Sequence, residues 1–171
     1  MKQILKVLLA IVIICGVGYG IYMIVPEYPH NFIKSFVQPV VDVEAKLRIE
    51  QVKNLDVNIK GLEGVTYQQA LEKNTGMSCW VYEKDEAAGT EMVVYRGNGA
   101  SVNMKDVKDY GEKLYTSASV KFEFHIDGTK VEVIPFLDGT EMNIKDGKHV
   151  EQNKEVLKMI VTQLSSGIQE E

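Results

Sequence analysis

The sequence predicts an α+β fold: one N-terminal transmembrane helix, followed by an antiparallel sheet of four to five strands packed with two to three helices. Three features predict it: an uncharged apolar run near the start, segments of period-two alternation in the middle, and apolar stripes at helical spacing around them. The expected division is a transmembrane signal anchor (1–26), a juxtamembrane connector or stalk (27–51), an extracytoplasmic α+β domain (52–166) and a polar tail (167–171).

The apolar run carries no charged residue between Val7 and Val25. As a helix, about 19 residues would cover roughly 28 Å, which is close to the hydrocarbon thickness of a bilayer. Lys2 and Lys6 precede the run without an acidic neighbour, and such flanking cations stay on the cytoplasmic side. We therefore expect a single-pass protein of the cell membrane that contacts the bilayer through residues 7–25, with its N-terminus cytoplasmic and its C-terminal domain outside.

A cleaved signal peptide is the alternative interpretation of the same run, and it stays open. Small residues at Gly16, Gly18 and Gly20 have the spacing that a signal peptidase needs. The apolar run continues past them, which favours an uncleaved anchor. Lipidation is not expected, because Ile14 rather than a small residue precedes Cys15.

The stretch at residues 40–52 is ambiguous between helix and strand. Apolar and charged residues alternate along it, which is typical of a strand. Val41, Ala45, Ile49 and Val52 also form a helical stripe, and Pro39 would suit a helix start. We favour the helix.

A short strand and a helix are expected next. Leu55, Val57 and Ile59 alternate with polar residues and suggest the strand. Thr66 has the spacing of a capping box with Gln69, so a helix should begin there. We expect Ala70 and Leu71 to face inward and Gly76 to end the helix.

Two antiparallel hairpins are expected along the middle of the chain. The first joins residues 77–82 to residues 92–96 through a polar turn, and the sequence Gly97-Asn98-Gly99 should end its second strand. A short helix is expected at residues 104–115.

The second hairpin joins residues 120–126 to the strand that follows, with Asp127-Gly128 as its two-residue turn. That turn would place three apolar residues opposite apolar partners on the facing strand, and His125 opposite Lys130 on the outer face. The expected apolar pairs are Phe124 with Val131, Phe122 with Val133, and Val120 with Pro135.

The last part of the chain should contain two more turns and a helix. Asp138-Gly139 and Asp146-Gly147 have turn composition. The helix carries one apolar stripe and ends near Gly167. The stripe consists of Val156, Leu157, Ile160, Val161 and Leu164.

The sequence carries no recognisable catalytic, cofactor or metal signature. The three histidines, at positions 30, 125 and 149, have no ligand spacing to one another or to a cysteine. Neither a phosphate-binding loop nor a nucleophile motif occurs.

The predicted anchor holds none of the 24 Asp and Glu residues, so the rest of the chain is more acidic than the overall net charge of −5. An acidic domain without a basic stripe argues against nucleic acid as a partner.

Trp80 and Tyr82 are the candidate contact residues, because they share one face of a predicted strand, opposite Cys79 and Val81. In one interpretation a helix covers that face. In the other, the two aromatic residues form an exposed strip, which usually marks a contact with another protein. Cys79 itself is expected to be a small buried residue rather than a reactive thiol.

The order of these motifs resembles a family of uncharacterised small membrane-anchored or exported bacterial α+β domains with no assigned activity. The resemblance covers about residues 52–164. It lies in Val52-Lys53, Thr66-Tyr67-Gln68-Gln69-Ala70-Leu71, Trp80, Val93-Val94-Tyr95-Arg96-Gly97 and Val120-Lys121-Phe122-Glu123-Phe124. The chain departs from the family in its stretch at residues 103–116 and its longer connector. The resemblance implies a compact α+β domain and no catalytic residue.

Location is therefore the main clue to function. We expect a membrane-anchored, non-enzymatic extracytoplasmic interaction domain, an accessory or sensor component of a bacterial cell-envelope assembly. It would contact other envelope proteins through its sheet or through residues 40–52. The alternative is an extracytoplasmic binding or inhibitory module for a soluble partner.

Overall fold

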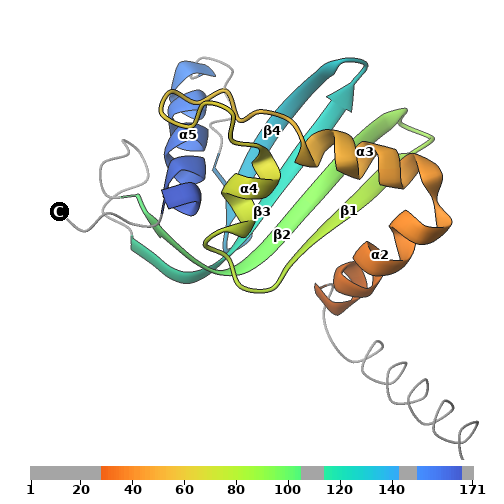
Figure 1. Ribbon diagram of the computed structural model, residues 1–171, viewed down its shortest axis with the longest axis horizontal. Coiled ribbons are helices and arrows are strands. Elements are labelled where there is room, and N and C mark those ends of the chain that lie inside the picture. Colours follow the sequence, from red (N-terminus) through yellow and green to blue (C-terminus); the bar gives the residue numbers. More distant parts are fainter. Residues whose placement is uncertain (1–27, 105–113, 143–149, 167–171) are drawn as a thin grey trace, which may run out of the picture.

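A computed structural model describes residues 28–104, 114–142 and 150–166 (Figure 1). Within them four helices and five strands follow one another along the chain. They are α2 (Tyr28–Val41), α3 (Val43–Lys53), α4 (Tyr67–Glu72), β1 (Ser78–Asp85), β2 (Thr90–Asn103), β3 (Leu114–Asp127), β4 (Lys130–Leu137), β5 (Thr140–Glu141) and α5 (Val150–Ser166). The expected transmembrane segment, residues 7–25, lies outside the described residues. Among the described helices, none has both the length and the apolarity that a membrane crossing requires.

The five strands form one antiparallel sheet in chain order, β1-β2-β3-β4-β5. Figure 1 shows α3, α4 and α5 lying across one face of this sheet, while α2 runs beside β1 at its edge. The α+β class and the antiparallel sheet are thus confirmed.

The core lies between the sheet and the three helices that cover it. Aromatic side chains of β1, β2 and β3 alternate toward the helices, so each second residue is buried on that face. Aliphatic side chains of α3, α4 and α5 close the core from the other side. The largest fully buried members are Tyr95, Phe122, Phe124, Leu71, Met104, Leu137, Met142, Ile160 and Leu164.

The ambiguous stretch is a helix, as favoured. Asp42 caps α3 by accepting a hydrogen bond from the backbone N–H of Ala45 at 3.0 Å. Ala45, Ile49 and Val52 face the core at helical spacing. The expectation that Pro39 starts this helix was wrong. Pro39 lies within the preceding helix α2, which occupies most of the stretch expected as connector.

The capping box of α4 is confirmed, since the Thr66 side chain accepts from the Gln69 backbone N–H and the Gln69 side chain accepts from the Thr66 backbone N–H. The helix ends at Glu72, one turn before Gly76. The expectation of a strand at residues 55–59 was wrong. Only an isolated bridge between Asp56 and Thr66 forms there, because the chain loops back on itself to begin α4.

The first hairpin is confirmed as β1 and β2, but Gly97-Asn98-Gly99 does not end β2. The strand continues to Asn103, and its pairing with β3 shifts register between Gly97 and Ala100. A glycine with positive φ, here Gly99 at 74°, is a usual component of such a β-bulge. The bulge keeps the strand in the sheet where the sequence suggested an end.

The second hairpin has the expected faces but a register shifted by two residues. Phe124 pairs with Val133 and Phe122 with Pro135, because the turn is Gly128-Thr129 rather than Asp127-Gly128. Side-chain alternation has a period of two, so it cannot distinguish registers that differ by two residues. A local feature favours this register: Gly128 takes a positive φ at the first turn position, which places Asp127 opposite Lys130. One further pair is Val120 with Leu137, and His125 lies opposite Glu132.

The C-terminal elements agree with their motifs where they are described. Asp138 and Gly139 both take positive φ and join β4 to β5. Helix α5 buries four of the five residues of its expected stripe, and Leu157 is partly buried. The helix expected at 104–115 lies mostly outside the described residues, although β3 already includes Leu114 and Tyr115. The turn Asp146-Gly147 also lies outside them.

Candidate contact surfaces

Trp80 and Tyr82 are buried, with 5% and 3% of their surfaces exposed. The Trp80 Nε1–H donates a hydrogen bond to Glu72 Oε1 at 2.7 Å, and Lys53 Nζ lies 5.9 Å from the centre of its ring. Residues of α4 and α3 therefore reach this face, as in the helix-covered interpretation. The hypothesis of an exposed aromatic strip at Trp80 and Tyr82 was wrong, because the strip forms part of the core.

Cys79 points to the opposite face of β1 and is also buried. Burial raises the pKa of its thiol, and the nearby Arg96 charge offsets this only in part. A buried thiol that stays protonated is a poor nucleophile. This placement agrees with the expectation of a structural cysteine.

Groups suited to metal binding do not gather in the described part of the chain, where no three His, Cys, Asp or Glu side chains converge. Of the three histidines, only the side chain of His125 is described. It lies on the sheet face opposite the helices, 3.2 Å from Glu123 Oε2.

That sheet face carries a short row of charges on β3. Glu123 accepts from Lys121 Nζ at 2.8 Å and contacts His125, while Lys121 Nζ also lies 3.7 Å from the centre of the Phe136 ring on β4. Burial alone would raise the pKa of Glu123. The hydrogen bonds and charges of Lys121 and His125 outweigh that effect and hold the pKa below its usual value.

Replacing this carboxylate, Glu123→Gln, should flatten the acid side of the stability profile. Because the pKa of Glu123 is lowered on folding, its contribution is present above the unfolded pKa and is lost as the pH falls through the folded pKa. Unfolding in urea at successive pH values below 5 would measure this. Glu132→Gln, an exposed residue of the neighbouring strand, is the matched control. Equal acid slopes in both variants would contradict the assignment.

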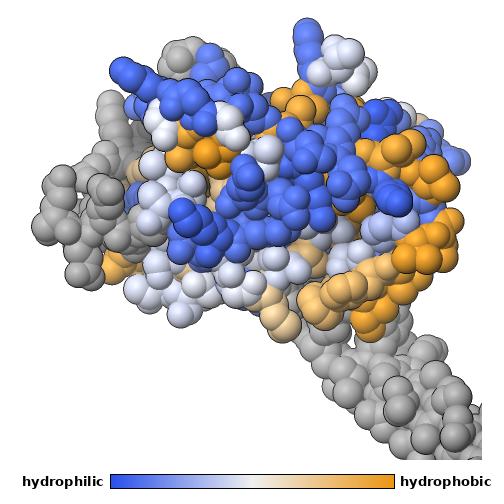
Figure 2. Space-filling model, in the orientation of Figure 1, coloured by the Kyte–Doolittle hydropathy of each residue, from blue (hydrophilic) through white to orange (hydrophobic). Residues whose placement is uncertain are grey.

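Among the residues that the structure describes, most of the exposed large apolar side chains lie on α2 and the first half of α3. Five exposed residues of α2 follow the spacing i, i+3, i+4, i+7, i+8 and form what we call the α2 stripe. Two exposed residues of α3, one turn apart, form the α3 ridge. The stripe is Ile33, Phe36, Val37, Val40 and Val41, and the ridge is Val43 and Leu47. Figure 2 shows this surface as the orange band on the side of the molecule that α2 and α3 occupy.

On the other side of α2, the Gln38 side chain is hydrogen-bonded to the edge of the sheet. Gln38 Oε1 accepts from the Tyr82 backbone N–H at 3.0 Å, and Gln38 Nε2 donates to the Tyr82 carbonyl at 2.8 Å. The amide thus takes the place of a neighbouring strand at β1, which would otherwise present unpaired backbone groups. Two residues further along β1, Lys84 Nζ lies 3.2 Å from Glu44 Oε1, and this ion pair links β1 to α3.

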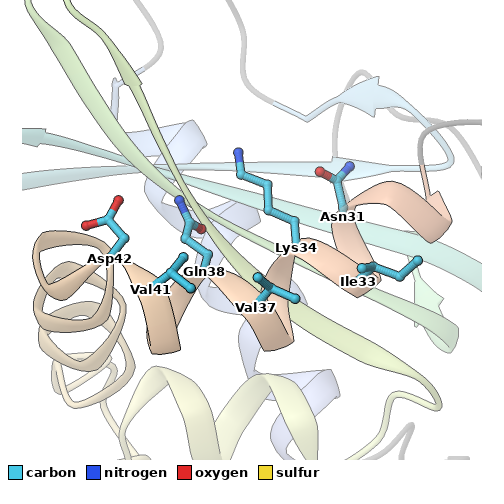
Figure 3. Close-up of a pocket in the computed structure, with 7 residues that line it drawn as sticks. All are labelled: Asn31, Ile33, Lys34, Val37, Gln38, Val41 and Asp42. Carbon is cyan, nitrogen blue, oxygen red and sulfur yellow. The ribbon is translucent and has the colours of Figure 1, made fainter. Parts of the chain in front are cut away.

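A shallow hollow of about 550 Å³ runs along α2. Figure 3 shows Ile33, Val37 and Val41 along one side of the helix, with Lys34 and Gln38 rising toward the sheet. Lys34 and Asp42 are its only charged lining residues. A hollow of this kind offers an apolar contact rather than a site for chemistry.

Comparisons with known proteins found no match. No protein-family model, no curated protein and no solved structure is significantly similar to this chain. The contact surface must therefore be argued from the chain itself. The α2 stripe was missed at the sequence level because Pro29 and Pro39 marked its segment as a connector, although the helical spacing of its apolar residues was present.

Proposed function

We propose that this chain is a membrane-anchored, non-enzymatic interaction domain on the outer side of a bacterial cell membrane, an accessory or sensor component of a cell-envelope assembly. One observation carries the proposal. Among the described residues nine large apolar side chains are exposed, and seven of them lie on α2 and α3, next in sequence to the expected anchor. Exposed apolar surface gathered in this way marks a contact site.

The α3 ridge is the part of this surface that suits a protein partner. Val43 and Leu47 are surrounded by the exposed charged residues Glu44, Lys46 and Glu50. An apolar centre with a polar rim is the usual composition of a protein interface. The opposite side of α3 is buried in the core, so the ridge is presented on a rigid element.

A photoreactive amino acid placed at Leu47 tests the proposal in the native host. The matched control carries the same amino acid at Lys154, an exposed position on α5. We expect the Leu47 variant to crosslink to an integral membrane protein and the Lys154 variant to give no such product. Protease added to intact cells, with lysed cells for comparison, serves as the orientation control.

Three results would count against the proposal. Crosslinking at Leu47 to a soluble protein alone would favour the alternative, a binding or inhibitory module for a soluble partner. Absence of any product at Leu47 would remove the ridge as the contact. A domain that resists protease until the cells are lysed would contradict the outward orientation.

A further inference from the structure

We infer that the α2 stripe lies on the outer surface of the lipid bilayer, with its apolar side chains among the headgroups and the upper acyl chains. This inference rests on the membrane anchor of the proposed function. It adds how the domain sits on that membrane and which of its sides the lipid covers.

The chain leaves little distance between the expected anchor and the stripe. The apolar run of the expected anchor ends at Val25 and α2 begins at Tyr28, so three residue steps separate them. Fully extended, three steps reach at most about 11 Å. The headgroup layer of one leaflet is itself roughly 5–8 Å thick. Helix α2 must then start at or just above the headgroups.

The composition of α2 fits that position. Between Asn31 and Val41, Lys34 is the only charged residue, whereas α3 carries five charged residues over a similar length. Apolar side chains on one face of a helix favour an interfacial location, because burial there removes them from water. Lys34 points toward the sheet, away from the stripe, so no charged side chain lies among the apolar residues that would meet the bilayer (Figure 3).

The distribution of charge favours lipid over a protein partner as the molecule that covers the stripe. The chain as a whole is acidic, with a net charge of −5, and an anionic leaflet would repel most of its surface. The described part of α2 carries one cation and no acidic residue, so an anionic leaflet would not repel this side of the domain. The α3 ridge, with its charged rim, lacks this property.

Lipid contact along α2 would also orient the sheet. Gln38 fixes α2 to β1 through both backbone groups of Tyr82, and Lys84 joins β1 to Glu44 of α3. With α2 on the bilayer, the edge of the sheet at β1 would face the membrane. The α3 ridge would then stand beside the membrane surface, within reach of an integral membrane partner.

Spin labels on the full-length chain test the inference in vesicles of phosphatidylethanolamine and phosphatidylglycerol. Labels are attached to Val37→Cys and Val40→Cys, with Lys130→Cys, at the exposed first residue of β4, as the control. Cys15 is replaced by alanine, and Cys79 stays in place because its side chain is buried and out of reach of the label. Unchanged emission from Trp80, the single tryptophan, shows that each variant is folded.

We expect labels at Val37 and Val40 to collide more with oxygen, which dissolves in lipid, than with a water-soluble nickel chelate, and the Lys130 label to show the reverse. Nickel access at Val37 and Val40 equal to that at Lys130 would place the stripe in water and overturn the inference. Low access to both reagents would mean that protein covers the stripe, which also overturns it. Flotation of the protein with the vesicles tests the anchor by itself. A chain that floats but shows nickel access at Val37 and Val40 contradicts only the lipid contact of the stripe. A chain that fails to float contradicts the anchor.

Discussion

The variant Phe124→Ala should lower the free energy of unfolding by about 3–5 kcal/mol, the usual cost of removing a fully buried aromatic side chain. Phe124 has no exposed surface, and its ring centre lies 5.0 Å from that of Tyr67 and 5.7 Å from that of Trp80. It therefore joins the sheet to α4, and the cavity left behind would open in the middle of the core. Because whole domains are stable by only about 5–15 kcal/mol, this variant should be marginally folded.

Urea unfolding of the full-length chain in mild detergent, followed by Trp80 fluorescence and circular dichroism, would measure the loss. Leu114→Ala is the control, because Leu114 is 50% exposed at the first residue of the same strand and lies outside the α2 stripe. Its effect should stay within about 0.5 kcal/mol. A similar loss in both variants would mean that the aromatic residues of β3 do not form the centre of the core.

The sequence was sufficient to predict this core because its faces follow from local alternation. Each of Val120, Phe122 and Phe124 is buried, and the residues between them are not. The same reasoning identified the stripe of α5 and the capping box of α4. These predictions depend on chemistry within a few residues, which a single sequence contains in full.

The errors arose where more than one structure satisfied the same local pattern. Registers that differ by two residues bury the same face, so the second hairpin needed the turn at Gly128 to decide between them. The aromatic face of β1 could be covered or exposed, and only the packing of α3 and α4 on Trp80 decides this. Long-range packing of this kind cannot be derived from periodicity.

The candidate contact surface was foreseen only in part. Residues 40–52 were expected to offer a contact, and the α3 ridge lies within them. The α2 stripe was not foreseen, because two prolines in its segment suggested a connector. Pro29 lies in the first turn of α2, where a proline is tolerated, and Pro39 lies inside the helix, which continues past it to Val41.

The variant Gly97→Ala should lower the free energy of unfolding by about 1–3 kcal/mol, although alanine suits a strand no worse than glycine does. An added Cβ would lie 2.7 Å from Tyr95 Oη, closer than such atoms approach in folded proteins, and 3.0 Å from Thr75 Cβ, which is also a tight contact. Tyr95 cannot easily move aside, since its hydroxyl donates to the Leu71 carbonyl at 2.8 Å and lies 2.6 Å from Thr75 Oγ1. Gly97 is therefore a packing position beneath a fixed tyrosine rather than the strand end that the sequence suggested.

A double-mutant cycle with Tyr95→Phe separates this clash from a general loss of strand stability. Tyr95→Phe alone should cost about 1–3 kcal/mol, because the buried hydroxyl and its hydrogen bonds are lost. In the double variant the closest contact is absent, so the combined loss should be smaller than the sum by at least about 0.5 kcal/mol. Ser101→Ala, at an exposed position of the same strand, controls for the substitution itself. Strict additivity of Gly97→Ala and Tyr95→Phe would show that the hydroxyl does not restrict position 97, and the glycine would then need another explanation.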